Sequence, residues 1–178
     1  MQLRNWGSLL ASLALQCASA EAANLVTNPD FTSDVSGWTV NALSWDGADG
    51  DPAPGSAHFV TPVEGTTDNS ACIVIAAPQN IDLLDNIKVA SGSVAVNVIS
   101  FTDTNCANSP SFFTGTPITA TSTWQQYSVT NVALPNGTNS VLIQLTSTFP
   151  GGSDAHFDHI LFGPSGSAPV RLQSFDVR

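Results

Sequence analysis

The sequence has few cations. Lys and Arg together number 4, against 14 Asp and Glu, which gives a formal net charge of -10. A protein that binds nucleic acid neutralises phosphates with Lys and Arg, so this balance argues against a nucleic-acid partner. The same charge opposes docking on anionic lipid headgroups. After the N-terminal segment, no apolar stretch approaches the roughly 20 residues that cross a bilayer, so we expect no membrane insertion.

The sequence also lacks the patterns of common enzymes. A glycosidase needs two facing carboxylates, yet Glu21 and Glu64 are the only glutamates, and the many aspartates lie mostly in turn-like segments. There is no Gly-x-Ser-x-Gly nucleophile elbow and no glycine-rich phosphate loop followed by Lys. We therefore assign no catalytic residue and expect a protein that is not an enzyme.

The first residues have the three parts of a secretory signal peptide. Arg4 supplies a positive charge, residues 9–15 are almost entirely apolar, and Ala18-Ser19-Ala20 is a small-x-small cleavage pattern, with Ala20-Glu21-Ala22 as a second option. A short buried helix is the alternative for this segment. We predict a signal peptide over residues 1–20 and a secreted protein, extracellular or periplasmic.

Cleavage of that signal changes the cysteine count. Three cysteines become two, Cys72 and Cys106, because Cys17 is removed. An even pair in an oxidising compartment predicts a disulfide, which would stabilise the fold by roughly 3 to 4 kcal/mol in the chain-entropy description. Two unrelated buried thiols are the alternative.

From residue 24 onward the sequence shows no convincing helical period. Alternating apolar and polar residues with many β-branched side chains indicate strands instead. Residues 81–89 are ambiguous between one helical turn and a strand, and the neighbouring strands favour the latter. Short turn-rich clusters, residues 65–69 among them, separate these runs, which is typical of an all-β antiparallel sandwich or jelly roll. The predicted strands cover residues 38–43, 71–76, 94–101, 124–132, 141–146 and 155–162.

Two segments resemble a known family. Residues 24–31 read Asn-Leu-Val-Thr-Asn-Pro-Asp-Phe and precede Gly37-Trp38, and residues 155–162 read Ala-His-Phe-Asp-His-Ile-Leu-Phe near the end. This order resembles the galactose-binding-domain-like jelly roll, in particular the carbohydrate-binding modules of secreted cellulases and xylanases. The resemblance implies a β-sandwich over residues 24–163, non-catalytic glycan binding and a structural calcium ion. Residues 164–178 are predicted to be a linker and C-terminal tail.

The calcium prediction depends on three positions. The family places an acidic residue in its last strand, which Asp158 matches, and a Glu after the Phe of its first motif, where this sequence has Thr32. Asp30 stands where the family usually has Gly and would compensate for that missing carboxylate. The alternative is that Asp158 is bonded to nearby backbone N–H groups, and both readings stay open.

Sugar binding calls for aromatic faces and for side chains that bond hydroxyl groups. We nominate Trp45, which lies in a Gly- and Asp-rich segment, the adjacent pair Phe112 and Phe113, and the strand amides Asn97 and Gln126. Together they predict a concave binding face.

The histidines do not form a metal motif in the sequence. His156 and His159 are three residues apart, so on a strand they face opposite sides and cannot share a zinc ion. His156 and Asp158 share a face, which allows a hydrogen-bonded pair, and His58 is interpreted as structural.

The sequence thus predicts a secreted, non-catalytic protein that binds a poly- or oligosaccharide, with a secreted enzyme or an envelope protein as a further partner. Exposed Trp45 and Phe113 also fit an adhesion or structural sandwich that contacts other proteins. A small glycoside hydrolase or an associated protein is the third alternative.

Overall fold

The structure is a computed structural model that describes residues 24–76, 80–108, 110–113, 115–148 and 150–166. These residues form strands and no helix, so they contain no helix long and apolar enough to cross a membrane. The predicted signal segment and residues 167–178 of the predicted tail lie outside the described residues. The strands are β1 (Leu43–Asp46), β2 (Ser56–Thr61), β3 (Thr67–Asn69), β4 (Ile73–Val74), β5 (Asn80–Ser91), β6 (Ser93–Phe101), β7 (Ser111–Phe113), β8 (Ile118–Thr119), β9 (Gln125–Ala133), β10 (Ser140–Ser147) and β11 (Ser153–Pro164).

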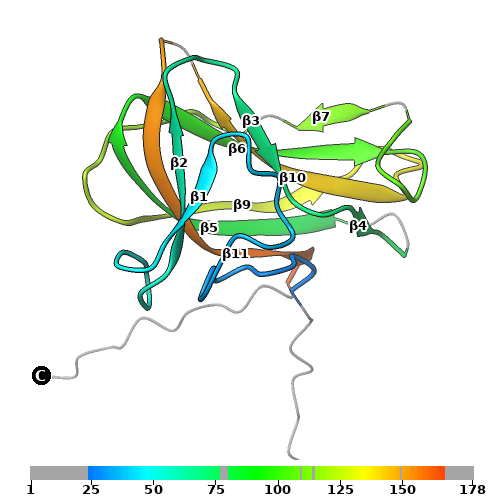
Figure 1. The fold of residues 1–178 in the computed structure, drawn as a ribbon. Coiled ribbons are helices and arrows are strands. Elements are labelled where there is room, and N and C mark those ends of the chain that lie inside the picture. Colours follow the sequence, from blue (N-terminus) through cyan, green and yellow to red (C-terminus); the bar gives the residue numbers. More distant parts are fainter. Residues whose placement is uncertain (1–23, 77–79, 109, 114, 149, 167–178) are drawn as a thin grey trace, which may run out of the picture.

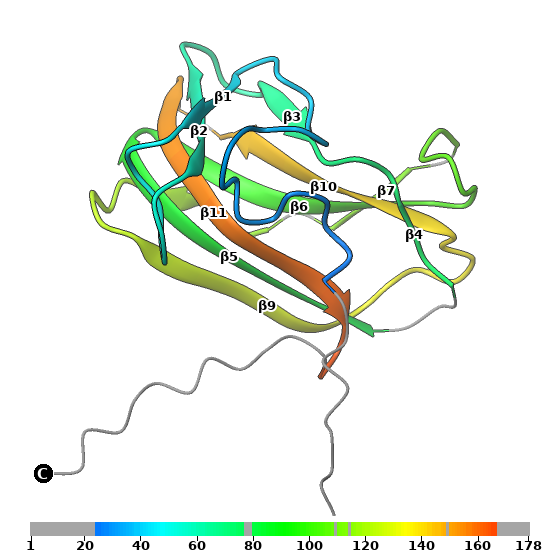
Figure 2. The ribbon, with the colours of Figure 1, turned by 60° about the horizontal axis from the view of Figure 1, so that its bottom comes forward.

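The strands form two antiparallel sheets that stack as a sandwich (Figures 1 and 2). The five-stranded sheet has the order β1-β2-β11-β5-β9. The six-stranded sheet has the order β3-β10-β6-β7, with β4 also paired to β10 and β8 also paired to β6. The predicted all-β antiparallel sandwich is therefore confirmed.

Alternate residues of the central strands build the core between the sheets. Val141, Ile143 and Leu145 of β10 are completely buried, as are Ala155 and Phe157 of β11. Because side chains of a strand alternate between its two faces, this pattern points the intervening residues outward. Each large apolar side chain that leaves water in this way contributes about 1.5–3 kcal/mol.

Most of the predicted strands are observed with shifted ends. The segments 94–101, 124–132, 141–146 and 155–162 correspond to β6, β9, β10 and β11, and the ambiguous segment 81–89 lies within strand β5. The predicted strand 71–76 is reduced to the two residues of β4.

Two local predictions are wrong. Residues 38–43 do not form a strand: Trp38 makes one isolated bridge with Ser70, and regular pairing begins at Leu43. The cause is the buried carboxylate of Asp68, which accepts the N–H groups of Asn41 and Ala42 at 2.7 and 2.8 Å and so bends this segment. The predicted turn over residues 65–69 is partly strand, because β3 pairs with β10 there.

The predicted disulfide is present. Cys72 and Cys106 are bonded, with their Cα atoms 5.8 Å apart and a sequence separation of 34. It joins the segment before β4 to the loop that follows β6, so it ties together two connections at one end of the six-stranded sheet.

The predicted linker begins inside the sheet. Strand β11 runs to Pro164, and the N–H of Ser165 donates to the carbonyl of Asn80 at 2.9 Å. The N–H of Gly166 donates to the Asp82 carboxylate at 2.8 Å. The first residues of the predicted tail are thus held against β5.

Candidate functional site

The nominated ligand residues lie on different sheets. Asn97 is on β6 of the six-stranded sheet, whereas Trp45 is on β1 and Gln126 is on β9, at opposite edges of the five-stranded sheet. The structure therefore does not bring these three residues to one face. The strand that carries Phe112 and Phe113, β7, pairs with β6 and belongs to the same sheet as Asn97.

The Trp45 side chain is half exposed, with 45% of its surface accessible. Its indole N–H donates to the carbonyl of Phe31 at 2.7 Å, and the ring covers Gly47 so closely that a Cβ there would lie 2.5 Å from a ring carbon. These contacts fix the orientation of the ring at the surface. Gln126 is exposed opposite Asn86 of β5.

Three amide side chains form a row across the six-stranded sheet. Asn69 of β3, Gln144 of β10 and Asn97 of β6 are direct cross-strand neighbours. The Asn97 Nδ2 donates to Gln144 Oε1 at 3.2 Å, and the Gln144 Nε2 donates to Asn69 Oδ1 at 3.1 Å. Asn97 Oδ1 also accepts the N–H of Gly115 at 3.1 Å. We call Asn69, Gln144 and Asn97 the amide row.

The amide row points away from the core. Asn97 lies between the core residues Val96 and Val98, and Gln144 lies between Ile143 and Leu145. Asn69 and Gln144 are partly exposed, whereas Asn97 is 7% exposed. Each amide has two N–H donors and an acceptor with two lone pairs, so the bonds within the row use only part of their capacity.

An apolar pair lies beside the amide row. Leu142 of β10 and Ile99 of β6 are direct partners two residues along each strand from Gln144 and Asn97. Leu142 is partly exposed, and Phe112 pairs in register with Ile99. The outer face of this sheet therefore combines amides with apolar surface, which is the mixture expected of a sugar-binding face. Sequence reasoning missed Asn69, because it predicted a turn there.

The three calcium candidates do lie together. Asp30, Thr32 and Asp158 line one open pocket of about 290 Å³, with Pro52, Pro54 and His159 among its other walls. The structure thus brings the N-terminal motif against the last strand at the place where the resemblance implies a calcium ion.

The contacts of Asp158 match the alternative in which its carboxylate is bonded to nearby backbone N–H groups. Its carboxylate accepts the N–H of Asp51 and the N–H of His159, each at 2.7 Å. Burial raises the pKa of Asp158 to about 6, against the lowering effect of these two N–H groups, and the neighbouring charge of Asp30 adds to the rise. The imidazole of His159 lies 2.7 Å from Asp30.

These residues fit a cation. Two carboxylates line one pocket, and each Asp158 oxygen keeps a lone pair beyond its N–H bond. Calcium takes six to eight oxygen ligands, so carbonyl groups and water would complete the set around Asp30, Thr32 and Asp158. Calcium binding stays a prediction.

The hydrogen bond that a shared face would allow between His156 and Asp158 is not observed, and Asp158 accepts the N–H groups of Asp51 and His159 instead. His156 Nδ1 instead lies 3.0 Å from the hydroxyl of Ser56. Burial, together with the charges of His58 and Lys88, lowers the pKa of His156 to about 4, so the imidazole is neutral at pH 7.

Known proteins match this chain in structure. No protein-family model matches the sequence, and no curated protein matches it either. The xylan-binding domain of carbohydrate-binding module family 22 superposes with a TM-score of 0.62 at 8% identity, over 81% of this chain and 97% of that one. The module TmCBM61, in complex with beta-1,4-galactotriose, has a TM-score of 0.58 at 12% identity, over 81% and 100% of the two chains.

A third match is the CBM22-1 and GH10 module pair of xylanase 10B from Clostridium thermocellum, complexed with xylohexaose. It has a TM-score of 0.61 at 14% identity, over 80% of this chain and 29% of that longer one. At such identities the likeness shows the fold. The chain has the β-sandwich fold of carbohydrate-binding modules, as its terminal motifs predicted.

Proposed function

We propose that this protein binds a poly- or oligosaccharide, without cleaving it, on the outer face of the six-stranded sheet. The observation that carries the proposal is the amide row of Asn69, Gln144 and Asn97. Neighbouring strands lie about 4.8 Å apart, so the row extends about 10 Å across three strands. A sugar hydroxyl both donates and accepts hydrogen bonds, and a primary amide can answer both roles.

The surroundings of the row support a sugar ligand. Leu142, which is partly exposed above the buried Ile99, offers apolar surface for the C–H face of a pyranose ring beside the amides. The solved structures with the same fold include modules complexed with galactotriose and with xylohexaose, which favours a chain of several sugars as the ligand class.

Affinity electrophoresis tests the proposal. The protein is run through native gels that contain soluble xylan, galactan or a cellulose derivative, and isothermal titration with a matching oligosaccharide follows any retardation. Gln144→Ala and Asn69→Ala each remove a partly exposed member of the row, and we expect each to weaken binding about tenfold or more, which corresponds to about 1.4 kcal/mol.

Gln125→Ala is the matched control, because Gln125 is an exposed amide on β9 of the other sheet. Its affinity should equal that of the unmodified protein. Retardation on none of the polysaccharides, or equal losses in all three variants, would refute the proposed site. Release of reducing sugar from a bound polysaccharide would refute the non-catalytic role.

We also propose that calcium binds between the N-terminal motif and β11, at Asp30, Thr32 and Asp158. The pocket that these residues share and the lone pairs that the Asp158 oxygens keep support it. Calcium would raise the melting temperature of the protein, and Asp158→Asn would abolish that rise. A melting temperature that does not respond to calcium chloride would contradict this proposal.

We further propose that the protein is exported through the predicted signal over residues 1–20. The disulfide between Cys72 and Cys106 supports an oxidising compartment, where such bonds persist. Expression of the full chain in a secreting host, followed by N-terminal sequencing, should give a secreted protein that begins directly after Ala20. Intracellular retention of the uncleaved chain would contradict the proposal.

A further inference from the structure

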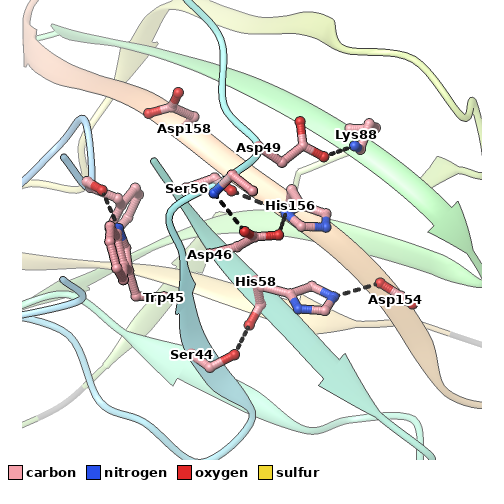
Figure 3. A network of polar contacts seen from close by, with 12 residues as sticks. Ser44, Trp45, Asp46, Asp49, Ser56, His58, Lys88, Asp154, His156 and Asp158 are labelled. Atoms are coloured by element: carbon pink, nitrogen blue, oxygen red, sulfur yellow. Dashed lines mark hydrogen bonds and ion pairs between the residues drawn. The ribbon is translucent and has the colours of Figure 1, made fainter. Parts of the chain in front are cut away.

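Two histidines that are distant in sequence meet on the outer face of the five-stranded sheet. His58 of β2 and His156 of β11 are direct partners in an antiparallel pair. Their rings are stacked, with centroids 4.2 Å apart and planes inclined by 9°. Asp154 precedes His156 by two residues and so shares its face, and Figure 3 shows its carboxylate beside the His58 ring.

The three side chains offer ligand atoms at close range. His58 Nε2 lies 2.9 Å from Asp154 Oδ1, and one ligand atom from each of the three residues lies within 4.8 Å of the other two. In a tetrahedral zinc site with bonds of 2.0–2.1 Å, ligand atoms are separated by about 3.4 Å. Metal binding therefore requires side-chain rotations that bring the ligand atoms of His58, His156 and Asp154 closer together.

A second set of contacts orients His156. The hydroxyl of Ser56, which is completely buried, lies 3.0 Å from His156 Nδ1, and a carboxylate oxygen of Asp46 lies 4.0 Å from the same nitrogen. Metal-binding histidines characteristically have their second ring nitrogen fixed in this manner by an oxygen-bearing group. The bond to Ser56 leaves His156 Nε2 for a ligand.

The local charge favours a cation. The carboxylates of Asp46, Asp49 and Asp154 surround the histidine pair, whereas Lys88 is the cation paired in register with His156 (Figure 3). Lys88 is itself bound to Asp49 and lies over the ring of Trp124. The charges of Lys88 and Asp49 therefore offset each other, and Asp46 and Asp154 are the carboxylates that favour a cation here.

The cluster is open on one side. The side chains of His58 and Asp154 are 30% and 40% exposed, whereas that of His156 is 9% exposed. An ion from solvent can therefore reach the cluster past His58 and Asp154, and water can occupy its remaining position.

We propose that His58, His156 and Asp154 bind one divalent transition-metal ion of the zinc type. Two imidazole nitrogens and one carboxylate oxygen are a donor set that suits zinc, copper or nickel better than calcium or magnesium, which prefer oxygen. The site lies on the opposite sheet from the amide row, and its donors differ from those of the calcium pocket. It is thus independent of the proposed saccharide binding.

Calorimetric titration of untagged, EDTA-treated protein with zinc chloride tests the site. We expect one zinc ion per chain, and we expect cobalt(II) to give the visible absorption of a four-coordinate site. His58→Gln and Asp154→Asn alter partly exposed side chains, so these variants should fold, and each should weaken zinc binding by about tenfold or more. Ser56→Ala should weaken it by about 10- to 100-fold at unchanged stoichiometry, because it only frees the His156 ring.

His159→Gln is the matched control. His159 is the third and last histidine of the sequence and is bonded to Asp30 rather than to the cluster. This variant should bind zinc as the unmodified protein does, and circular dichroism should show that every variant is folded. The absence of saturable binding up to about 1 mM zinc would overturn the proposal. Unchanged affinity in His58→Gln, or an equal loss in His159→Gln, would also overturn it.

Discussion

Asp85 is a carboxyl group enclosed by the core of the sandwich. It lies on β5 between Leu83 and Ile87, both of which face the core, and none of its surface is exposed. Neither carboxylate oxygen has a hydrogen-bond partner among the described residues. Burial raises the pKa of Asp85 well above its ordinary value, and the nearby charge of Asp158 adds to the rise. The backbone N–H of Asp158 acts in the other direction and lowers the pKa of Asp85, although it does not form a hydrogen bond with the carboxylate.

Replacement of Asp85 should therefore stabilise the protein. A buried polar group without a partner costs about 1–3 kcal/mol, and well-packed apolar substitutes for buried charges are often stabilising. Asp85→Val keeps a compact, β-branched side chain in a strand, so we expect the free energy of unfolding near pH 8 to increase by about 1–3 kcal/mol. For a chain of this size each kcal/mol raises the melting temperature by about 2–4 °C. Asp85→Asn removes the charge but not the polar atoms, so its gain should be smaller.

The gain in stability from Asp85→Val should depend on pH, and the direction of that dependence follows from the pKa shift of Asp85. Because the folded-state pKa of Asp85 is raised, folding favours the protonated form. The stability that this shift contributes to the unmodified protein is fully present below the unfolded-state pKa of about 3.9. It is lost as the pH rises towards the folded-state pKa. The advantage of Asp85→Val over the unmodified protein should thus be larger near pH 8 than near pH 4.

Urea denaturation followed by tryptophan fluorescence measures both quantities, since the chain contains 4 tryptophans. The two proteins are compared at about pH 4 and at about pH 8 with equal denaturant slopes as the check on two-state unfolding. Asp85→Val that is no more stable than the unmodified protein near pH 8, or a difference that is the same at both pH values, would refute the reasoning.

Further predictions concern the disulfide, the bent segment before β1 and one tight contact. Replacing both Cys72 and Cys106 by Ala opens a 34-residue separation and should lower the free energy of unfolding by about 4 kcal/mol in urea titrations. Asp68→Ala removes a buried acceptor of two N–H groups and should cost about 3 kcal/mol by the same assay; an unchanged midpoint would contradict its structural role. Gly152→Ala would place a Cβ 2.0 Å from the carbonyl oxygen of Thr61, so its melting temperature should fall by several degrees, whereas Gly65→Ala meets no atom within 4 Å and should fall less.

The strands that the sequence predicts well are those whose pattern is local. In β10, Val141, Ile143 and Leu145 alternate with Leu142, Gln144 and Thr146, and this period of two, which only Leu142 interrupts, is visible without any knowledge of the neighbouring strands. Strand β6 is similarly rich in valine and isoleucine. The β-branched residues fit a pleated surface and disfavour a helix, so the predicted element type and its position both agree with the structure for these two strands.

The segment before β1 shows why other predictions are wrong. Residues 38–43 have the composition of a strand, yet they are bent by Asp68, which is 27 residues from Asn41 in the chain. A carboxylate that captures backbone N–H groups competes with strand pairing. That competition depends on the tertiary fold, so no local sequence pattern predicts it.

The same distinction between local pattern and tertiary fold applies to the candidate sites. Alternation implies that Asn97 and Gln144 point away from the core, and it implies the same for His156 once Phe157 is assigned to the core. It does not reveal which strands are neighbours. Asn69 joins the amide row only because β3 pairs with β10, and Ser56 meets His156 across a separation of 100 residues only because β2 pairs with β11. The orientation of each residue on the two outer faces therefore follows from the local alternation, whereas its neighbours are determined by the order of the strands in the sheet. A site that needs three strands is recognisable only when that order is known.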